Sequence, residues 1–128
     1  MITIPVSVGE LIDKLSILQV KKTKITNPES LKYINKEFEL LHNSSSIFLN
    51  DEEIKKLYLS LIETNSKLWD IEDKLRVTET EKNFNTQFIE LARSVYYTND
   101  ERFSLKNKIN KITSSEIREV KEYVKYQS

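Results

Sequence analysis

The sequence contains no cysteine and a single histidine, His42. Without cysteine, the chain can form no disulfide, offer no thiolate to a metal and use no thiol as a nucleophile. One histidine is too few for a ferritin-like di-metal centre, which needs two Glu-x-x-His elements, and a structural zinc site is excluded as well. Disulfides, thiol chemistry and these two kinds of metal site are therefore excluded, and His42 is expected to be exposed to solvent.

Residues that interrupt helices are also rare. The chain has one glycine, Gly9, and two prolines, Pro5 and Pro28. Such a composition favours long helices. The 128 residues suit one domain, a size at which roughly two-thirds of the unfolded surface can be buried on folding. We therefore predict a single all-α domain over residues 1–128.

No charge of one sign dominates, because 20 Lys and Arg residues balance 20 Asp and Glu residues. No overall field therefore draws the protein to nucleic acid or to an anionic membrane. The N-terminus lacks a basic segment followed by a long apolar run, and no stretch approaches the ~18 apolar residues of a membrane span. We expect a cytoplasmic protein that contacts neither nucleic acid nor membrane.

Start signals and apolar spacing predict two N-terminal helices. Ser7 and Glu10 form a capping-box pattern before a helix over about 8–24. Asn27 and Pro28 begin the second helix, with apolar residues at helical spacing as far as Leu41. Residues 42–46 have no such spacing and are predicted to form a loop.

Two longer apolar stripes follow, over about 51–80 and 86–112. The break between them is short, so the two helices should form an antiparallel hairpin that packs with the N-terminal helices. After an interruption at Ser114 and Ser115, a short C-terminal helix is predicted from Ile117, Val120 and Val124.

Polar residues fall in the middle of the apolar faces of this hairpin. On a helical wheel Asn65 and Glu72 lie near the centre of the first face, and the second face holds the polar residues Asn99, Arg102 and Lys106. Buried polar groups cost stability unless they are paired. We therefore predict a buried polar layer in which Asn65 is level with Asn99. A cationic partner for Glu72 is expected from outside the hairpin, with Lys14 as a candidate.

Two interpretations of this layer stay open. The simpler one is that it fixes the alignment of the helices. The other is a pocket for a small polar ligand. The residues expected to line that pocket are Trp69, Glu72, Tyr96, Asn99, Arg102 and Lys106. Both describe a protein that acts through binding or assembly; no cofactor and no catalytic residue is predicted, and whether it is an enzyme stays open.

The first helix is apolar on two sides. Leu11, Leu15 and Leu18 share one face, whereas Ile17 and Val20 point the other way. Such a helix is usually sandwiched, either within the fold or against a second subunit. We predict a homodimer formed through this helix.

Pairs of carboxylates suggest an alternative function. Glu10 with Asp13, and Asp70 with Asp73, are each three residues apart, as a helix-borne Mg²⁺ site for nucleotide hydrolysis requires. The spacing resembles the acidic motifs of all-α nucleoside triphosphate pyrophosphohydrolases. That resemblance implies a Mg²⁺-dependent nucleotide hydrolase.

Three segments resemble those of a family of small uncharacterised proteins. They are residues 7–18 (SVGELIDKLSIL), 68–76 (LWDIEDKLR) and 88–102 (FIELARSVYYTNDER). The family occurs in bacteria, marine ones included, and is catalogued as a domain of unknown function. The resemblance extends over nearly the whole chain and implies a single all-helical domain, with no chemistry attached.

Overall fold

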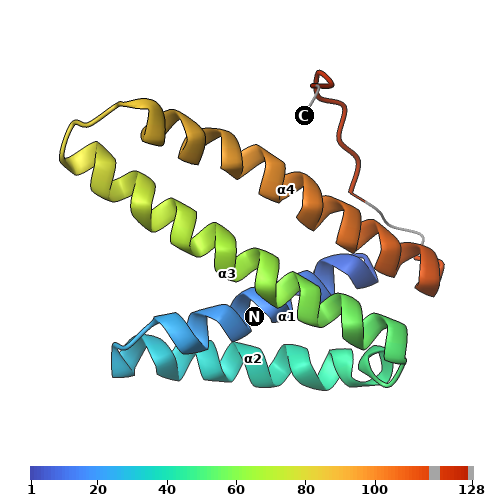
Figure 1. The fold of residues 1–128 in the computed structure, drawn as a ribbon. Helices are drawn as coiled ribbons and strands as arrows, with labels where there is room; N and C mark the ends of the chain where they lie inside the picture. Colours follow the sequence, from blue (N-terminus) through green and yellow to red (C-terminus); the bar gives the residue numbers. More distant parts are fainter. Residues whose placement is uncertain (116–118, 127–128) are drawn as a thin grey trace.

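Four helices make up the protein in a computed structural model that describes residues 1–115 and 119–126. Their bounds are Val8–Lys24 for α1, Pro28–Leu49 for α2, Glu52–Thr80 for α3 and Thr86–Thr113 for α4. Figure 1 shows α3 and α4 as a long antiparallel hairpin, with α1 and α2 forming a second hairpin across its base. Neither of the two described ranges contains a strand. The predicted all-α class with its long hairpin is confirmed.

Polar side chains begin the helices close to where the sequence predicts. The Ser7 hydroxyl accepts a hydrogen bond of 3.0 Å from the backbone N–H of Glu10. Glu10 does not complete the capping box, because its carboxylate lies 2.8 Å from the ammonium of Lys106. The other three helices have N-caps whose side chains accept from backbone N–H groups of the first turn: Asn27, Asp51 and Asn85.

The loop predicted at residues 42–46 is wrong, because α2 continues to Leu49. The Ser45 hydroxyl donates a 2.6 Å hydrogen bond to the carbonyl of Leu41, and Ser46 donates to Asn43 at 3.1 Å. Serine side chains that bond back to their own helix are compatible with helical backbone. A serine run without apolar spacing can therefore continue a helix, as it does here.

The short C-terminal helix predicted around Val120 and Val124 is also not found, since residues 119–126 are not helical. Ser114 ends α4 in the left-handed conformation, with φ of 53°. The segment after it contacts α4, where the Lys121 ammonium lies 5.3 Å from the Phe103 ring centre. The predicted position Ile117 lies outside the described residues.

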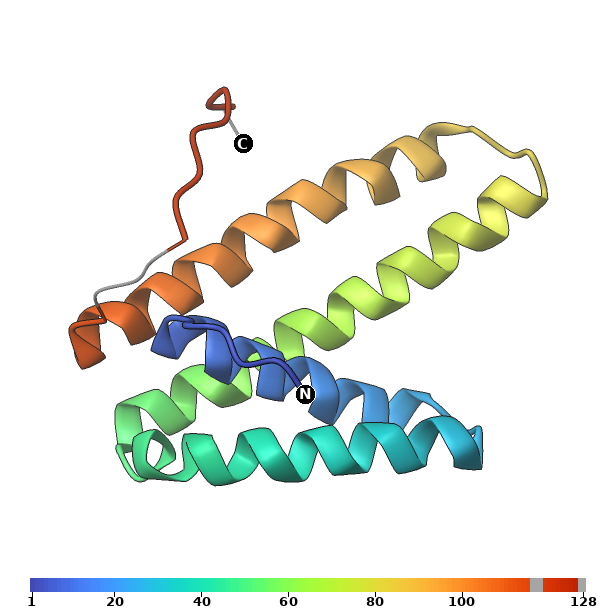
Figure 2. The same cartoon turned by 180° about the vertical axis from the view of Figure 1, so that it is seen from behind.

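The core lies at the base of the long hairpin, where all four helices meet. Its buried cluster consists of Ile12, Ile54, Leu61 and Ile109. Figure 2 shows α1 between α2 and the α3–α4 hairpin. The second apolar side of α1 faces that hairpin, and Val20 is buried there. This side is thus covered within the chain, while the homodimer through α1 stays a prediction.

The outer part of the hairpin extends past this core (Figure 1). The last buried residue of α3 is Ile71, and the first buried residue of α4 is Thr98. Between these positions the two helices pack on each other, and Tyr96 and Tyr97 of α4 also contact the ring of Tyr126. The polar residues that the sequence singles out lie where the hairpin leaves the core.

Candidate functional site

A buried carboxylate on α1, that of Asp13, is the centre of the site, and its side chain is 1% exposed. Arg102 of α4 donates to it twice, from Nε at 2.9 Å and from Nη2 at 2.5 Å. Asn65 of α3 donates from Nδ2 to the same carboxylate at 3.1 Å and to the Ser16 hydroxyl at 2.8 Å. We call Asp13, Ser16, Asn65 and Arg102 the polar layer. It joins three helices through charged and neutral hydrogen bonds.

The ion pair fixes both the charge and the position of Arg102. Its hydrogen bonds to Asp13 raise the pKa of Arg102 above the ordinary value, although burial acts in the opposite direction. A two-point contact between guanidinium and carboxylate is the strongest kind of side-chain hydrogen bonding and defines the plane of the group. Arg102 is therefore a charged group held in one orientation.

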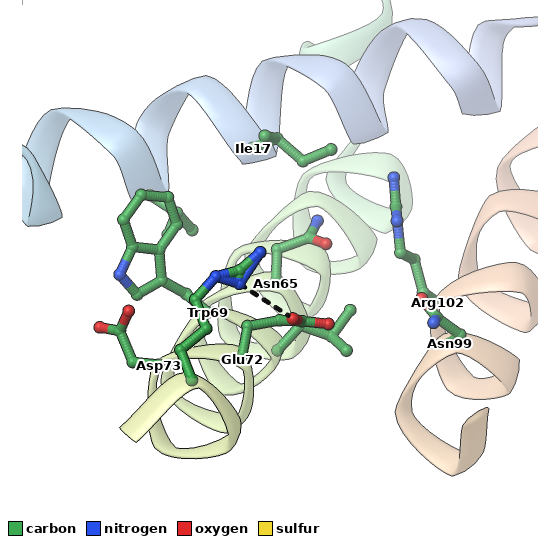
Figure 3. Close-up of a pocket in the computed structure, with 10 residues that line it drawn as sticks. Ile17, Asn65, Trp69, Glu72, Asp73, Asn99 and Arg102 are labelled. Carbon is green, nitrogen blue, oxygen red and sulfur yellow. Dashed lines mark ion pairs between the residues drawn. The ribbon is translucent and has the colours of Figure 1, made fainter. Parts of the chain in front are cut away.

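A pocket of about 630 Å³ lies beside the polar layer, between α1, α3 and α4 (Figure 3). We call it the layer pocket. It is lined by Ile17, Val20, Asn65, Leu68, Trp69, Glu72, Asp73, Arg76, Asn99 and Arg102. The pocket thus brings together four of the residues that the sequence predicts for a ligand site: Trp69, Glu72, Asn99 and Arg102.

Glu72 does not belong to the buried layer in which it was predicted. Its side chain is 49% exposed and lies 3.6 Å from the guanidinium of Arg76 on the same helix. The proposed partner Lys14 instead pairs with Glu37 of α2 at 3.3 Å. Glu72 follows Ile71, the last buried residue of α3, so no third helix covers it. It lines the open side of the layer pocket.

Tyr96 and Lys106 lie outside the layer pocket. Tyr96 borders a separate cavity of about 820 Å³ between α4 and the C-terminal segment, where its ring packs against Tyr126. Lys106 is buried and lies 2.8 Å from Glu10 and 2.7 Å from Glu119. Burial favours a lower pKa for Lys106, but these two carboxylates together with the charge of Asp13 outweigh it, and the pKa is raised.

The structure does not bring together the four carboxylates predicted for a magnesium site: Glu10, Asp13, Asp70 and Asp73. Asp70 pairs with Lys24 at 3.0 Å on the surface, and Asp73 lines the layer pocket. Glu10 pairs with Lys106, and Asp13 pairs with Arg102. Among the residues that the structure describes, no group of three or more His, Asp or Glu side chains is arranged to hold a metal ion. The nucleotide hydrolase stays a prediction.

These features define an all-α protein with a polar layer beside an open pocket. Over residues 2–128 the chain matches the model of a family described as "Family of unknown function (DUF6165)". The chain belongs to this family, which confirms the resemblance to a domain of unknown function. Comparisons with curated proteins and with solved structures each find no match. Within the described residues, no helix has the length and apolar character needed to cross a bilayer.

Proposed function

We propose that this protein is a helical binding protein that holds a small polar ligand in the layer pocket. The observation that carries the proposal is the bonding of Arg102. A guanidinium has five N–H donors, and Asp13 accepts only two of those of Arg102. The Arg102 side chain is 27% exposed and lines the pocket. Donors that Asp13 leaves free are therefore within reach of a ligand.

The fixed orientation of Arg102 supports the same proposal. Because Asp13 already holds the side chain from its buried edge, a ligand that binds to the other edge loses little affinity to side-chain ordering. A layer that only aligned the helices would need no member that opens into a cavity. We infer that the layer does both: it aligns α1, α3 and α4, and it positions Arg102.

Asn99 lies one turn before Arg102 on α4 and lines the same pocket. Within the two described ranges, its side chain makes no hydrogen bond, which leaves the amide for a ligand. Leu68, Trp69 and Ile17 provide an apolar wall. The pocket volume of about 630 Å³ lies in the range of roughly 300–1,000 Å³ found for ligand sites.

The proposal can be tested by fluorescence, because Trp69 is the only tryptophan and lines the pocket. We expect at least one compound from a panel of carboxylates, phosphate esters, amino acids and sugars to change its emission saturably. Calorimetry should give the same dissociation constant. The variant Asn99→Ala should weaken that binding about tenfold, since it removes a hydrogen bond to the ligand.

Asn83→Ala is the matched control, because Asn83 is exposed in the turn between α3 and α4. It should leave both the affinity and the melting temperature unchanged. Equal affinities for the wild type and the Asn99→Ala variant would place the ligand elsewhere. A panel without any binder would leave only the alignment role of the layer.

A further inference from the structure

We infer that the ligand of the layer pocket is a small zwitterion with an apolar side group, as a free amino acid or a short peptide is. This inference rests on the proposed function and specifies its ligand. It comes from the distribution of charge and of hydrogen-bonding groups between the two long helices that form opposite sides of the pocket.

The α4 side of the pocket offers hydrogen-bond donors. Figure 3 shows Asn99 and Arg102 projecting from α4, across the pocket from Trp69, Glu72 and Asp73 of α3. Arg102 keeps the donors that Asp13 does not use, and the Asn99 amide can donate beside them. A planar carboxylate can accept from both groups at once. This side is suited to the anionic end of a ligand.

The α3 side offers the complementary groups. Glu72 and Asp73 follow Trp69 by three and four residues, so each carboxylate is a neighbour of Trp69 on the helix surface. Figure 3 shows Glu72 on the side toward α4 and Asp73 on the side of the indole ring. An ammonium group is attracted both by carboxylates and by the face of an indole ring. This side is suited to the cationic end.

The ion pair between Glu72 and Arg76 does not block that role. The two side chains are 49% and 73% exposed and lie 3.6 Å apart, beyond hydrogen-bonding distance. Exposed pairs within one helix contribute little to stability. A ligand ammonium can therefore replace the guanidinium of Arg76 at low cost.

The total charge at the pocket favours a zwitterion over an ion of one sign. The charged groups are two guanidiniums and three carboxylates, those of Arg76, Arg102, Glu72, Asp73 and, behind Arg102, Asp13. A multiply charged anion such as a phosphate ester meets net negative surroundings. A simple cation leaves the donors of the α4 side unused. A zwitterion matches both sides and adds no net charge.

The apolar part of the pocket indicates the side group. Ile17 and Val20 of α1 and Leu68 of α3 line the pocket beside the charged residues. Burying an aliphatic group against them is favourable, at about 25 cal/mol for each Å² removed from water. The volume of about 630 Å³ leaves room for an amino acid or a dipeptide.

The test uses the full chain and four related probes, followed through Trp69 emission and calorimetry. L-leucine and its dipeptide carry both charges, whereas N-acetyl-L-leucine keeps only the carboxylate and L-leucinamide only the ammonium. We expect a zwitterion to bind, and each singly charged analogue to bind about tenfold more weakly or worse, since each lacks a charged hydrogen bond.

The variant Glu72→Gln should weaken binding of the zwitterion several-fold and leave binding of N-acetyl-L-leucine unchanged. Glu63→Gln is the matched control, an exposed glutamate of α3 that does not line the layer pocket. Equal affinity for either singly charged analogue would overturn the inference. So would binding of another compound to the pocket when neither leucine zwitterion binds, although the proposed function would then stand. Absence of any Asn99-dependent ligand would overturn both.

Discussion

Replacing Arg102 with methionine will lower the free energy of unfolding by about 3–5 kcal/mol, the usual cost of removing one partner from a buried ion pair. The large effect comes from what remains: the Asp13 carboxylate is 1% exposed and loses both of its hydrogen bonds to the guanidinium. Among the described residues, the hydrogen bond from Asn65 and the more distant charge of Lys106 would then be left to compensate the buried carboxylate. Urea unfolding followed by circular dichroism measures the change.

A second substitution separates the buried charge from the loss of contacts. Leucine has the shape of aspartate without its charge, so the double variant Asp13→Leu/Arg102→Met should be more stable than Arg102→Met alone. Their coupling in a double-mutant cycle is expected to be about 2–3 kcal/mol, as for other residues in direct contact. If the two single effects simply add, Asp13 and Arg102 do not form the pair described here.

Lys106→Met is the matched control, because Lys106 lies one turn further along α4 and is also paired with carboxylates. Those partners, Glu10 and Glu119, have side chains that are 44% and 35% exposed. Water can solvate them once the lysine is gone, so the loss should stay at about 1 kcal/mol. A cost equal to that of Arg102→Met would contradict the special position of Asp13.

Gly9→Ala will destabilise the protein by about 2 kcal/mol, even though alanine is the better helix former by about 1 kcal/mol. A Cβ atom at Gly9 would lie 2.4 Å from the backbone carbonyl oxygen of Lys106 and 2.9 Å from the Asn110 amide oxygen. The Gly9 N–H also donates to that amide oxygen at 2.7 Å. The added methyl group must therefore push α1 away from α4.

Thermal and urea unfolding of the Gly9→Ala variant measure this effect. Lys14→Ala is a suitable comparison, because Lys14 is an exposed residue of the same helix. A substitution at an exposed site usually changes the free energy of unfolding by well under ~1 kcal/mol. Since α1 carries Asp13, we also expect weaker ligand binding in the Gly9→Ala variant. An unchanged or higher stability would mean that α1 and α4 do not approach as closely as described.

Most of the fold could be predicted from local signals. Asn27 before Pro28, Asp51 and Asn85 are N-cap residues, and the apolar spacing that follows each of them gave the helices and the hairpin. The serines of residues 42–46 do not interrupt the helix, because a serine hydroxyl can donate to a backbone carbonyl inside a helix as well as in a loop. Apolar spacing after Ser115 misled, because two valines at helical spacing are only a weak helix signal.

The site was predicted less completely, because a helical wheel ranks faces and does not say how far neighbouring helices extend. Glu72 has the same place on its wheel as Asn65, yet it lies beyond the cover of α1 and is exposed. The spacing of Glu10 and Asp13 suggests a magnesium site, whereas the true partner of Asp13 is Arg102, 89 residues away in sequence and out of reach of any local pattern. A local indication that Asp13 is buried is its position directly after the core residue Ile12.

The central claim is that Asp13 holds Arg102 at the wall of the layer pocket, and the proton on Nε of Arg102 reports on it directly. In ¹H–¹⁵N spectra near neutral pH we predict that this proton exchanges slowly with water, because it is hydrogen-bonded to a buried carboxylate. The exposed Arg76 provides the fast-exchanging comparison in the same sample. An Arg102 proton that exchanges as fast as that of Arg76 would contradict the account.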